Sequence, residues 1–317
     1  MRADVLGSTV GWPPQRACDN LREYAEKAVL PRMDPSTARP QYHRRANNLS
    51  IKHEDRRQLE YVQIIPKPQF FSSVTRFCST HLPNINCGFD DVDHENGGGI
   101  TIDAPDFEPC AALAAVGKGS NTVQVFQWVM RYPLWTVNHM IHLAFNPTES
   151  YTLQEGEEFV DGDIFRWAIW ARDDESIMDS EDVYNADSVM IMVQPPWVLA
   201  EEDLRSFAQL GTFDHRDGRR KPMTSSERLW GKVWDLCYQK RAHWFVLTSY
   251  EFWMPEWTYA SVSPIMADYK SEPTTVQCLF FWFSSAVAKL VGREDTWPLP
   301  VVGNLFSYPA ASAWTQP

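Results

Sequence analysis

The run Ser188–Val193, SVMIMV, constrains the fold of this 317-residue chain more than any other segment. Its five consecutive apolar residues are too few for a core helix and are typical of a β-strand that is buried on both faces. Gln194 then ends the apolar run. Pro195 and Pro196 cannot continue a strand ladder, so they fix the direction in which the chain leaves. The segment therefore predicts a buried core strand that runs into a rigid Pro-Pro corner.

The segments around this strand predict helices on both sides of that sheet. Asp163–Arg172 alternates like a strand, and an acidic loop joins it to Ser188–Val193, which indicates a hairpin. The order expected over 151–290 is two strands, helices at 199–211 and 224–242, strands at 243–250 and 257–265, and a helix that begins near Glu272. We therefore expect an α/β or α+β fold, with a mixed central sheet flanked by helices.

Residues 1–150 are predicted to form a separate, partly irregular N-terminal extension or cap, and 151–317 the α/β core. In the extension we expect a helix near 18–30 and irregular structure over 61–112. The segment 121–145 combines a helical run with a strand-like end. Two roles stay open for the extension, since it either completes the sheet or forms a cap of its own.

Charge and composition limit the partners and the compartment of the protein. The net charge of −12 means that binding to nucleic acid needs a local basic patch, for which Arg219–Lys221 is a candidate. No apolar run is long enough to span a membrane, no signal peptide is visible, and the six cysteines are scattered like reduced thiols. We expect an intracellular protein, cytoplasmic or nuclear, with a nucleic-acid or protein partner and no membrane partner.

Familiar catalytic and metal-binding motifs are absent from the sequence. There is no nucleophile elbow, P-loop, dinucleotide-binding motif or H-E-x-x-H. His139 and His142 are spaced for one face of a helix, but no adjacent carboxylate or thiol completes a zinc site. The acidic segment 90–99 lacks the spacing of a calcium loop.

Acidic residues around the predicted hairpin are the best candidates for chemistry. Asp161 and Asp163 open the first strand, Asp187 opens the second, and Gln194 ends it. Oxygen ligands converging on Mg²⁺ could form there, because alternate side chains of a strand share one face. Two residues before Gln194, where a carboxylate ligand is usual, the chain has Met192, whose thioether is a poor ligand for Mg²⁺. The acids are either metal ligands or simply turn residues.

Three stretches carry a resemblance to a known family: SVMIMVQPPWVLAEEDL, SERLWGKVWDLCYQKRAHWFVLTSYEFW, and WTYASVSPI together with EPTTVQCLFFWFSSAV. They resemble nuclease-like domains of the PD-(D/E)xK superfamily, the restriction-endonuclease-like fold. The likeness is to divergent fungal forms, some of which accompany kinase-like or Crinkler-type proteins, and it covers roughly 150–290. The resemblance implies that an acid on the first hairpin strand and E-x-K on the second bind Mg²⁺ and activate water.

The resemblance assigns a role to individual residues. Asp163 (or Asp161) matches the metal-binding acid, whereas Met192 stands at the glutamate and Gln194 at the lysine. Two of the three positions therefore depart from the family. Some members are thought to carry the lysine on the next helix, where this chain has Lys232 and also Glu227.

Three functions follow as hypotheses. The first is a catalytically degenerate nuclease-like protein that acts as a binding or interaction module. The second is an active Mg²⁺-dependent phosphodiesterase with a migrated motif built on Asp163, Glu227 and Lys232. The third is a fold redeployed for small-molecule chemistry in an aromatic-lined pocket, since the chain has 14 tryptophans. No cofactor is predicted other than Mg²⁺, for the active form.

Overall fold

A computed structural model describes ten segments of the chain. They are 20–33, 63–85, 99–104, 119–156, 166–173, 187–210, 223–257, 261–262, 266–267 and 272–297. Asp161, Asp163, the acidic segment Asp90–Gly98 and the basic loop Arg219–Lys221 lie outside these residues.

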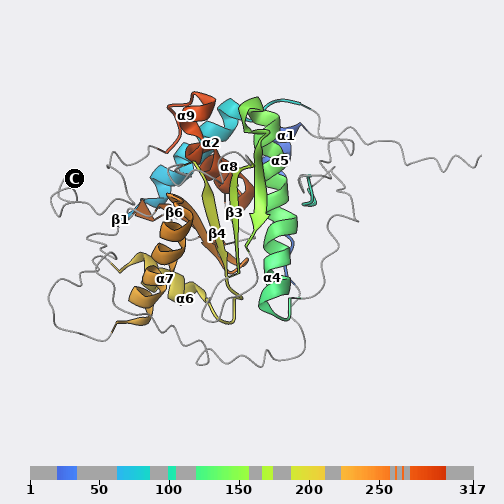
Figure 1. Cartoon of the computed structure of the whole chain (residues 1–317). Helices are drawn as coiled ribbons and strands as arrows, with labels where there is room; N and C mark the ends of the chain where they lie inside the picture. Colours follow the sequence, from blue (N-terminus) through green and yellow to red (C-terminus); the bar gives the residue numbers. More distant parts are fainter. Residues whose placement is uncertain are drawn as a thin grey trace, which may run out of the picture.

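The described strands form one mixed sheet (Figure 1). They are β1 (Gln63–Ile64), β2 (Tyr151–Glu155), β3 (Arg166–Arg172), β4 (Val189–Val193), β5 (Trp244–Thr248), β6 (Phe252–Trp257), β7 (Ser261–Val262) and β8 (Met266–Ala267). Their order is β1-β7-β6-β5-β4-β3-β2, and β8 also pairs with β6. β4 and β5 are parallel, whereas β2–β3, β3–β4 and β5–β6 are antiparallel. The predicted hairpin of β3 and β4 is confirmed.

Helices cover both sides of the sheet (Figure 1). They are α1 (Leu21–Lys27), α2 (Lys67–His81), α4 (Thr122–Val129), the π-helical η1 (Met130–Leu134), α5 (Trp135–Ala144), the 3₁₀-helical η2 (Asn146–Thr148), α6 (Glu201–Ala208), α7 (Ser225–Lys240), α8 (Thr275–Ala286) and α9 (Ala288–Val291). The predicted α/β class, with a mixed sheet flanked by helices, is confirmed. In the described part of the chain, every helix is too short or too polar to cross a membrane.

Strand β4 contributes to a hydrophobic cluster on each face of the sheet, because its side chains alternate. Val189, Ile191 and Val193 pack in a cluster with α1, α2, α4, α5 and α8, whereas Met190 and Met192 pack in a second cluster with α6 and α7. All five side chains are fully buried. The prediction of a strand buried on both faces is therefore confirmed. The strand is buried in this way because helices cover both sides of the sheet, which gives three layers.

Helix α2 corrects the expectation of irregular structure over 61–112. Its buried residues are Phe70, Val74, Phe77 and Cys78, at the spacing of one helix face. Pro68 misled the prediction, but it occupies the first turn of the helix, where the backbone N–H has no helical partner to lose.

The strand-like end expected within 121–145 is also wrong, since α4, η1 and α5 follow one another without a break. Pro133 interrupts the normal hydrogen bonding, and the backbone widens into the π-helical turn around it. The Thr101 hydroxyl donates to the Tyr132 carbonyl (2.9 Å), and the Thr101 N–H donates to the Thr136 Oγ1 (3.1 Å). The segment 99–104 thus supports the helix at the turn where the helix's own backbone hydrogen bonds are irregular.

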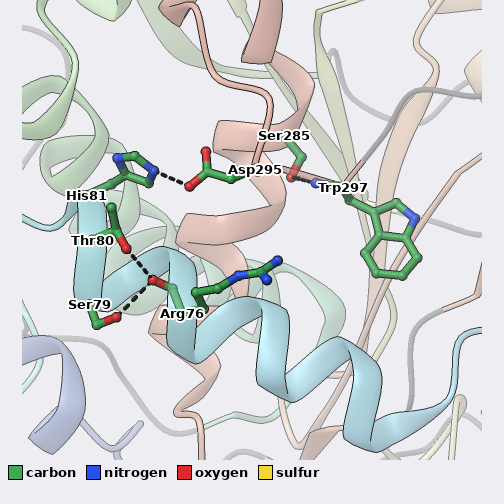
Figure 2. Close-up of polar contacts among 7 residues, drawn as sticks. All are labelled: Arg76, Ser79, Thr80, His81, Ser285, Asp295 and Trp297. Carbon is green, nitrogen blue, oxygen red and sulfur yellow. Dashed lines mark hydrogen bonds and ion pairs between the residues drawn. The ribbon is translucent and has the colours of Figure 1, made fainter.

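The described N-terminal helices pack against the C-terminal part of the chain. α1, α2 and α5 contact α8, and β1 pairs with β7 at one edge of the sheet. Figure 2 shows one further link, at the end of α2, and a bond within the C-terminal part of the chain. His81 Nε2 lies 2.5 Å from Asp295 Oδ2, and the Trp297 N–H donates to Ser285 Oγ on α8 (3.0 Å).

We predict that Gly156→Ala lowers the free energy of unfolding by about 1–3 kcal/mol, the usual cost of overpacking. A Cβ at Gly156 would lie 2.2 Å from Cε2 of the Trp167 ring, and Lys240 Nζ lies 4.7 Å from the centroid of the same ring. Urea unfolding measures the effect. Gln154→Ala in the adjacent strand is the control, with an expected change within about 0.5 kcal/mol. Equal stabilities for the Gly156 variant and the wild type would contradict the prediction.

Candidate functional site

The parallel pair β4 and β5 creates one sheet edge at which both carboxyl ends meet. In α/β sheets, ligands bind outside the carboxyl ends of such strands. Gln194 follows β4 directly and Ser249 follows β5 directly. This end of the sheet is therefore the first place to look for a functional site.

Gln194 and Ser249 form a buried polar pair at this edge. The Gln194 N–H donates to the Thr248 carbonyl (3.0 Å), and the pairing of Val193 with Thr248 makes Gln194 and Ser249 the next neighbours in register. Gln194 is 5% exposed and Ser249 is fully buried. In the structure as described, the Ser249 Oγ has no hydrogen-bond partner. A buried hydroxyl without a partner lowers the stability of the fold by about 1–3 kcal/mol, so the presence of Ser249 at this position needs an explanation.

Both side chains belong to the α6–α7 side of the sheet if strand alternation continues through them. Met190 and Met192 precede Gln194 on that face, and Phe245 and Leu247 precede Ser249. The sequence prediction therefore placed Gln194 correctly, at the end of a core strand. It missed Ser249, because the apolar run 243–250 was taken as strand throughout.

Tyr250 follows Ser249 in a strained backbone conformation. Tyr250 and Glu251 are the two central residues of the turn between β5 and β6, which is closed by the Ser249 N–H donating to the Phe252 carbonyl (3.1 Å), and the φ of Tyr250 is +72°. Glycine is preferred in such a position, and strain of this kind is concentrated at functional sites. The Tyr250 hydroxyl donates to the Pro31 carbonyl (2.6 Å), and the Tyr250 carbonyl accepts from Trp253 Nε1 (2.6 Å). These bonds and a ring contact with Trp128 at 5.4 Å hold the residue in place.

Glu251, the second loop residue, adds a carboxyl group at the surface. Burial raises the pKa of Glu251, and the nearby charge of Arg32 lowers it. Arg32 follows Pro31, to which Tyr250 is bonded, and Arg32 is exposed. The turn after β5 thus carries a carboxyl group that lies within the electrostatic influence of the Arg32 cation.

Of the residues considered around the hairpin, the structure describes Met192, Asp187 and Gln194. Met192 is fully buried between the sheet and the α6–α7 layer. Asp187 lies before β4 and Gln194 after it, so they are at opposite ends of the strand, roughly 23 Å apart at the usual strand rise. The positions of Asp161 and Asp163 lie outside the described residues.

Glu227 has a structural role at the start of α7. Its Oε2 accepts from the Thr224 N–H (2.5 Å), and its own N–H donates to the Thr224 Oγ1 (3.2 Å). This is a capping box, with Thr224 as the cap. Lys232 lies further along α7 and is partly buried.

We predict that Glu227→Ala lowers the free energy of unfolding by about 0.5–2 kcal/mol, because the Thr224 N–H loses its acceptor. Glu227→Gln should retain most of the stability, since glutamine also serves in a capping box. Guanidinium unfolding of the two variants measures the difference. Equal losses in both variants would show that the charge of Glu227, and not the cap, matters.

The two histidines of α5 and several tryptophans contact other parts of the protein or lie in its core. His142 Nε2 lies 3.0 Å from the Tyr151 carbonyl oxygen, and His139 is buried on α5. Over the segments that the structure describes, no group of three or more His, Cys, Asp or Glu side chains could hold a metal ion. Five tryptophans are fully buried in the core: Trp170, Trp230, Trp244, Trp253 and Trp282.

Comparisons with models of protein families, with curated proteins and with solved structures find no match to this chain. Fold and site together define a mixed α/β protein. Its central parallel strands end in a buried amide–hydroxyl pair beneath a strained, charged turn.

Proposed function

We propose that the chain is a catalytically degenerate nuclease-like protein that acts as a binding module. The observation that carries the proposal is the setting of Met192 and Gln194, the positions that correspond to E-x-K in the family resemblance. Met192 is fully buried against the α6–α7 layer, and Gln194 is 5% exposed with its N–H bonded to β5. A thioether is a weak ligand for Mg²⁺, and an amide carries no charge to assist water activation.

The β5–β6 turn is the proposed contact surface. Tyr250 fixes the turn through its bonds to Pro31 and Trp253, so Glu251 and Arg32 are presented with little freedom. Preorganised charges of both signs suit a protein partner, because they set orientation at a low entropic cost. The net charge of −12 also disfavours a polyanionic partner.

The competing hypothesis is a Mg²⁺-dependent phosphodiesterase built on Asp163, Glu227 and Lys232. The capping box weighs against it, since one oxygen of the Glu227 carboxylate already accepts from the Thr224 N–H. Magnesium is implied only by this second hypothesis.

Cleavage assays on DNA and RNA with Mg²⁺ or Mn²⁺ separate the two hypotheses. We expect the wild type and Asp163→Ala, purified in parallel, to show the same background. Turnover that is lost in Asp163→Ala and Lys232→Ala but retained in Asp173→Ala would establish the phosphodiesterase. Asp173 is the matched control because it is an exposed acid at the end of β3.

Selection of peptide ligands against the full-length chain tests the binding surface. Ligands of the proposed site should lose at least tenfold in affinity with Glu251→Gln or Arg32→Ala and be unaffected by Asp173→Ala. Ligands that bind all three variants equally would place the binding surface elsewhere.

A further inference from the structure

Strand β2 lies at one end of the strand order, next to β3. Within the described part of the chain it pairs with β3 alone, in an antiparallel ladder that sets Leu153 opposite Trp170. A strand in this position leaves the backbone groups of every second residue without a strand partner, so it can accept a further strand. The hydrogen bonds at the two ends of β2 decide which residues these are.

Two backbone bonds fix the direction of the peptide groups along β2. The Asp173 N–H donates to the Ser150 carbonyl (2.6 Å), and the Gly156 N–H donates to the Trp167 carbonyl (2.9 Å). In an antiparallel ladder alternate residues exchange bonds with the facing strand, so positions 150, 152, 154 and 156 direct their N–H and C=O groups toward β3. The residues between them direct these groups away from β3: Tyr151, Leu153 and Glu155.

The outward groups of Leu153 and Glu155 are open to a partner. At the first outward position, His142 Nε2 of α5 lies 3.0 Å from the Tyr151 carbonyl oxygen, which agrees with the direction assigned to this residue. Among the residues that the structure describes, no hydrogen bond engages the outward N–H or C=O of Leu153 or Glu155. Leu153 is half-buried and Glu155 is exposed. This stretch of β2 therefore presents two donors and two acceptors to an incoming strand.

The side chains of these two residues define what lies opposite them. Leu153 and Glu155 are two positions apart, so their side chains share one face of the sheet. Leu153 packs against the hydrophobic cluster that includes α5 and α8, whereas Glu155 lies at the surface. Residues directly opposite each other on paired strands interact, and opposite charges or apolar pairs are favourable there. An incoming strand therefore needs an apolar side chain opposite Leu153 and a basic one opposite Glu155.

Charge disfavours a second copy of the chain at this edge. Antiparallel pairing of two β2 strands through the same open groups sets Leu153 of each copy opposite Glu155 of the other. The two Glu155 side chains then become diagonal neighbours, about 7–8 Å apart, and their like charges repel. The net charge of −12 on each copy adds to this repulsion.

We propose that the edge of β2 binds an extended basic peptide segment of another protein as an added antiparallel strand. The main-chain bonds to Leu153 and Glu155 supply affinity, and the two side-chain positions supply specificity. Because the strands run in opposite directions, the lysine or arginine opposite Glu155 precedes the apolar residue opposite Leu153 by two positions. The surface does not depend on the function proposed above, since β3 and β4 separate β2 from β5.

Fluorescence anisotropy tests the main-chain bonds with the full-length chain and a labelled peptide, Thr-Thr-Lys-Thr-Val-Thr-Thr, blocked at both ends. In the bound strand the N–H groups of the lysine and the valine point toward β2, and that of the threonine between them points away. N-methylation of the valine nitrogen should therefore weaken binding at least about tenfold, because one bond is lost and the methyl group meets the β2 backbone. N-methylation of the intervening threonine is the matched control and should leave the affinity within about twofold. No binding of the parent peptide, or equal losses from both modifications, would overturn the proposal.

A charge exchange tests the position of the basic residue. The wild type should prefer the lysine peptide to the same peptide with glutamate in place of lysine, and Glu155→Lys should reverse this preference. Glu149→Lys changes the net charge equally at an exposed acid just before β2, and it should keep the wild-type preference. Equal changes in both variants would show that the preference comes from overall charge, which contradicts the assigned register.

A proline substitution tests the edge itself. Leu153→Pro removes only an N–H that faces away from β3, which edge strands tolerate, and it should abolish peptide binding. Glu251→Gln in the β5–β6 turn should leave peptide binding unchanged. Unfolding curves verify that each variant is folded, and the N-methylated peptides test the same edge on the wild type if Leu153→Pro is not. Sedimentation that shows a dimer, converted to a monomer by Leu153→Pro, would assign the edge to a second copy and overturn the proposal.

Discussion

Replacing Tyr250 with alanine should lower the free energy of unfolding by about 3–5 kcal/mol, the usual cost of truncating a buried aromatic residue. The Tyr250 ring is fully buried against Trp128, and its hydroxyl bonds the Pro31 carbonyl. Alanine keeps the unfavourable φ of +72° and the backbone hydrogen bonds of this residue, but it loses the ring contact with Trp128 and the hydroxyl bond to Pro31. Urea unfolding, followed by tryptophan fluorescence, measures the loss.

Two further variants separate the contacts of Tyr250 from its backbone strain. Tyr250→Phe removes only the hydroxyl bond to Pro31 and should cost about 0.5–1.5 kcal/mol. Tyr250→Gly removes the ring but relieves the left-handed backbone, so it should be no less stable than Tyr250→Ala. If Tyr250→Ala unfolds with the same urea midpoint as the wild type, the role given to Tyr250 is refuted.

Lowering the pH from 7 to 4 should lower the free energy of unfolding through His243, and this is the second large effect that we expect. Burial holds the pKa of His243 at about 4, below its ordinary value of 6.5, so between these values the unfolded chain binds more protons than the folded chain. Stability contributed by this residue is therefore intact above pH 6.5 and is lost as the pH falls toward 4. At about 1.4 kcal/mol for each pH unit, the full loss is at most about 3 kcal/mol.

The effect of His243 is measured as a difference between two proteins. Unfolding free energies of the wild type and of His243→Gln are compared across this pH range, and the wild type should lose more. Asp187 and Glu251 have raised pKa values, so their contribution has the opposite sign and cancels in the comparison. Parallel pH profiles for the two proteins would show that His243 is not the responsible group.

The central strands could be predicted from sequence, whereas helix α2 could not. Strand β4 is specified locally, because five consecutive apolar residues need burial on both faces. The cap of α7 also depends only on residues close in sequence, Thr224 and Glu227. In α2, Pro68 gave a local signal for irregular structure. The apolar face of the helix can be recognised only when its packing against α8 is known.

The candidate site depends on contacts that a sequence pattern does not contain. Gln194 was identified because it ends a core strand. Ser249 and Tyr250 become relevant only through the parallel register of β4 and β5, which joins residues more than fifty positions apart.

The packing of α2 on α8 has a consequence for synthesis of the chain. His81 and Asp295 are 214 residues apart, and Cys78 and Gln277, which are also bonded, are 199 apart. Because α8 is made long after α2, the apolar face of α2 has no native partner while most of the chain is translated. Contacts of such high order slow folding and leave apolar surface exposed to aggregation, so the N-terminal helices need protection until the last helices leave the ribosome.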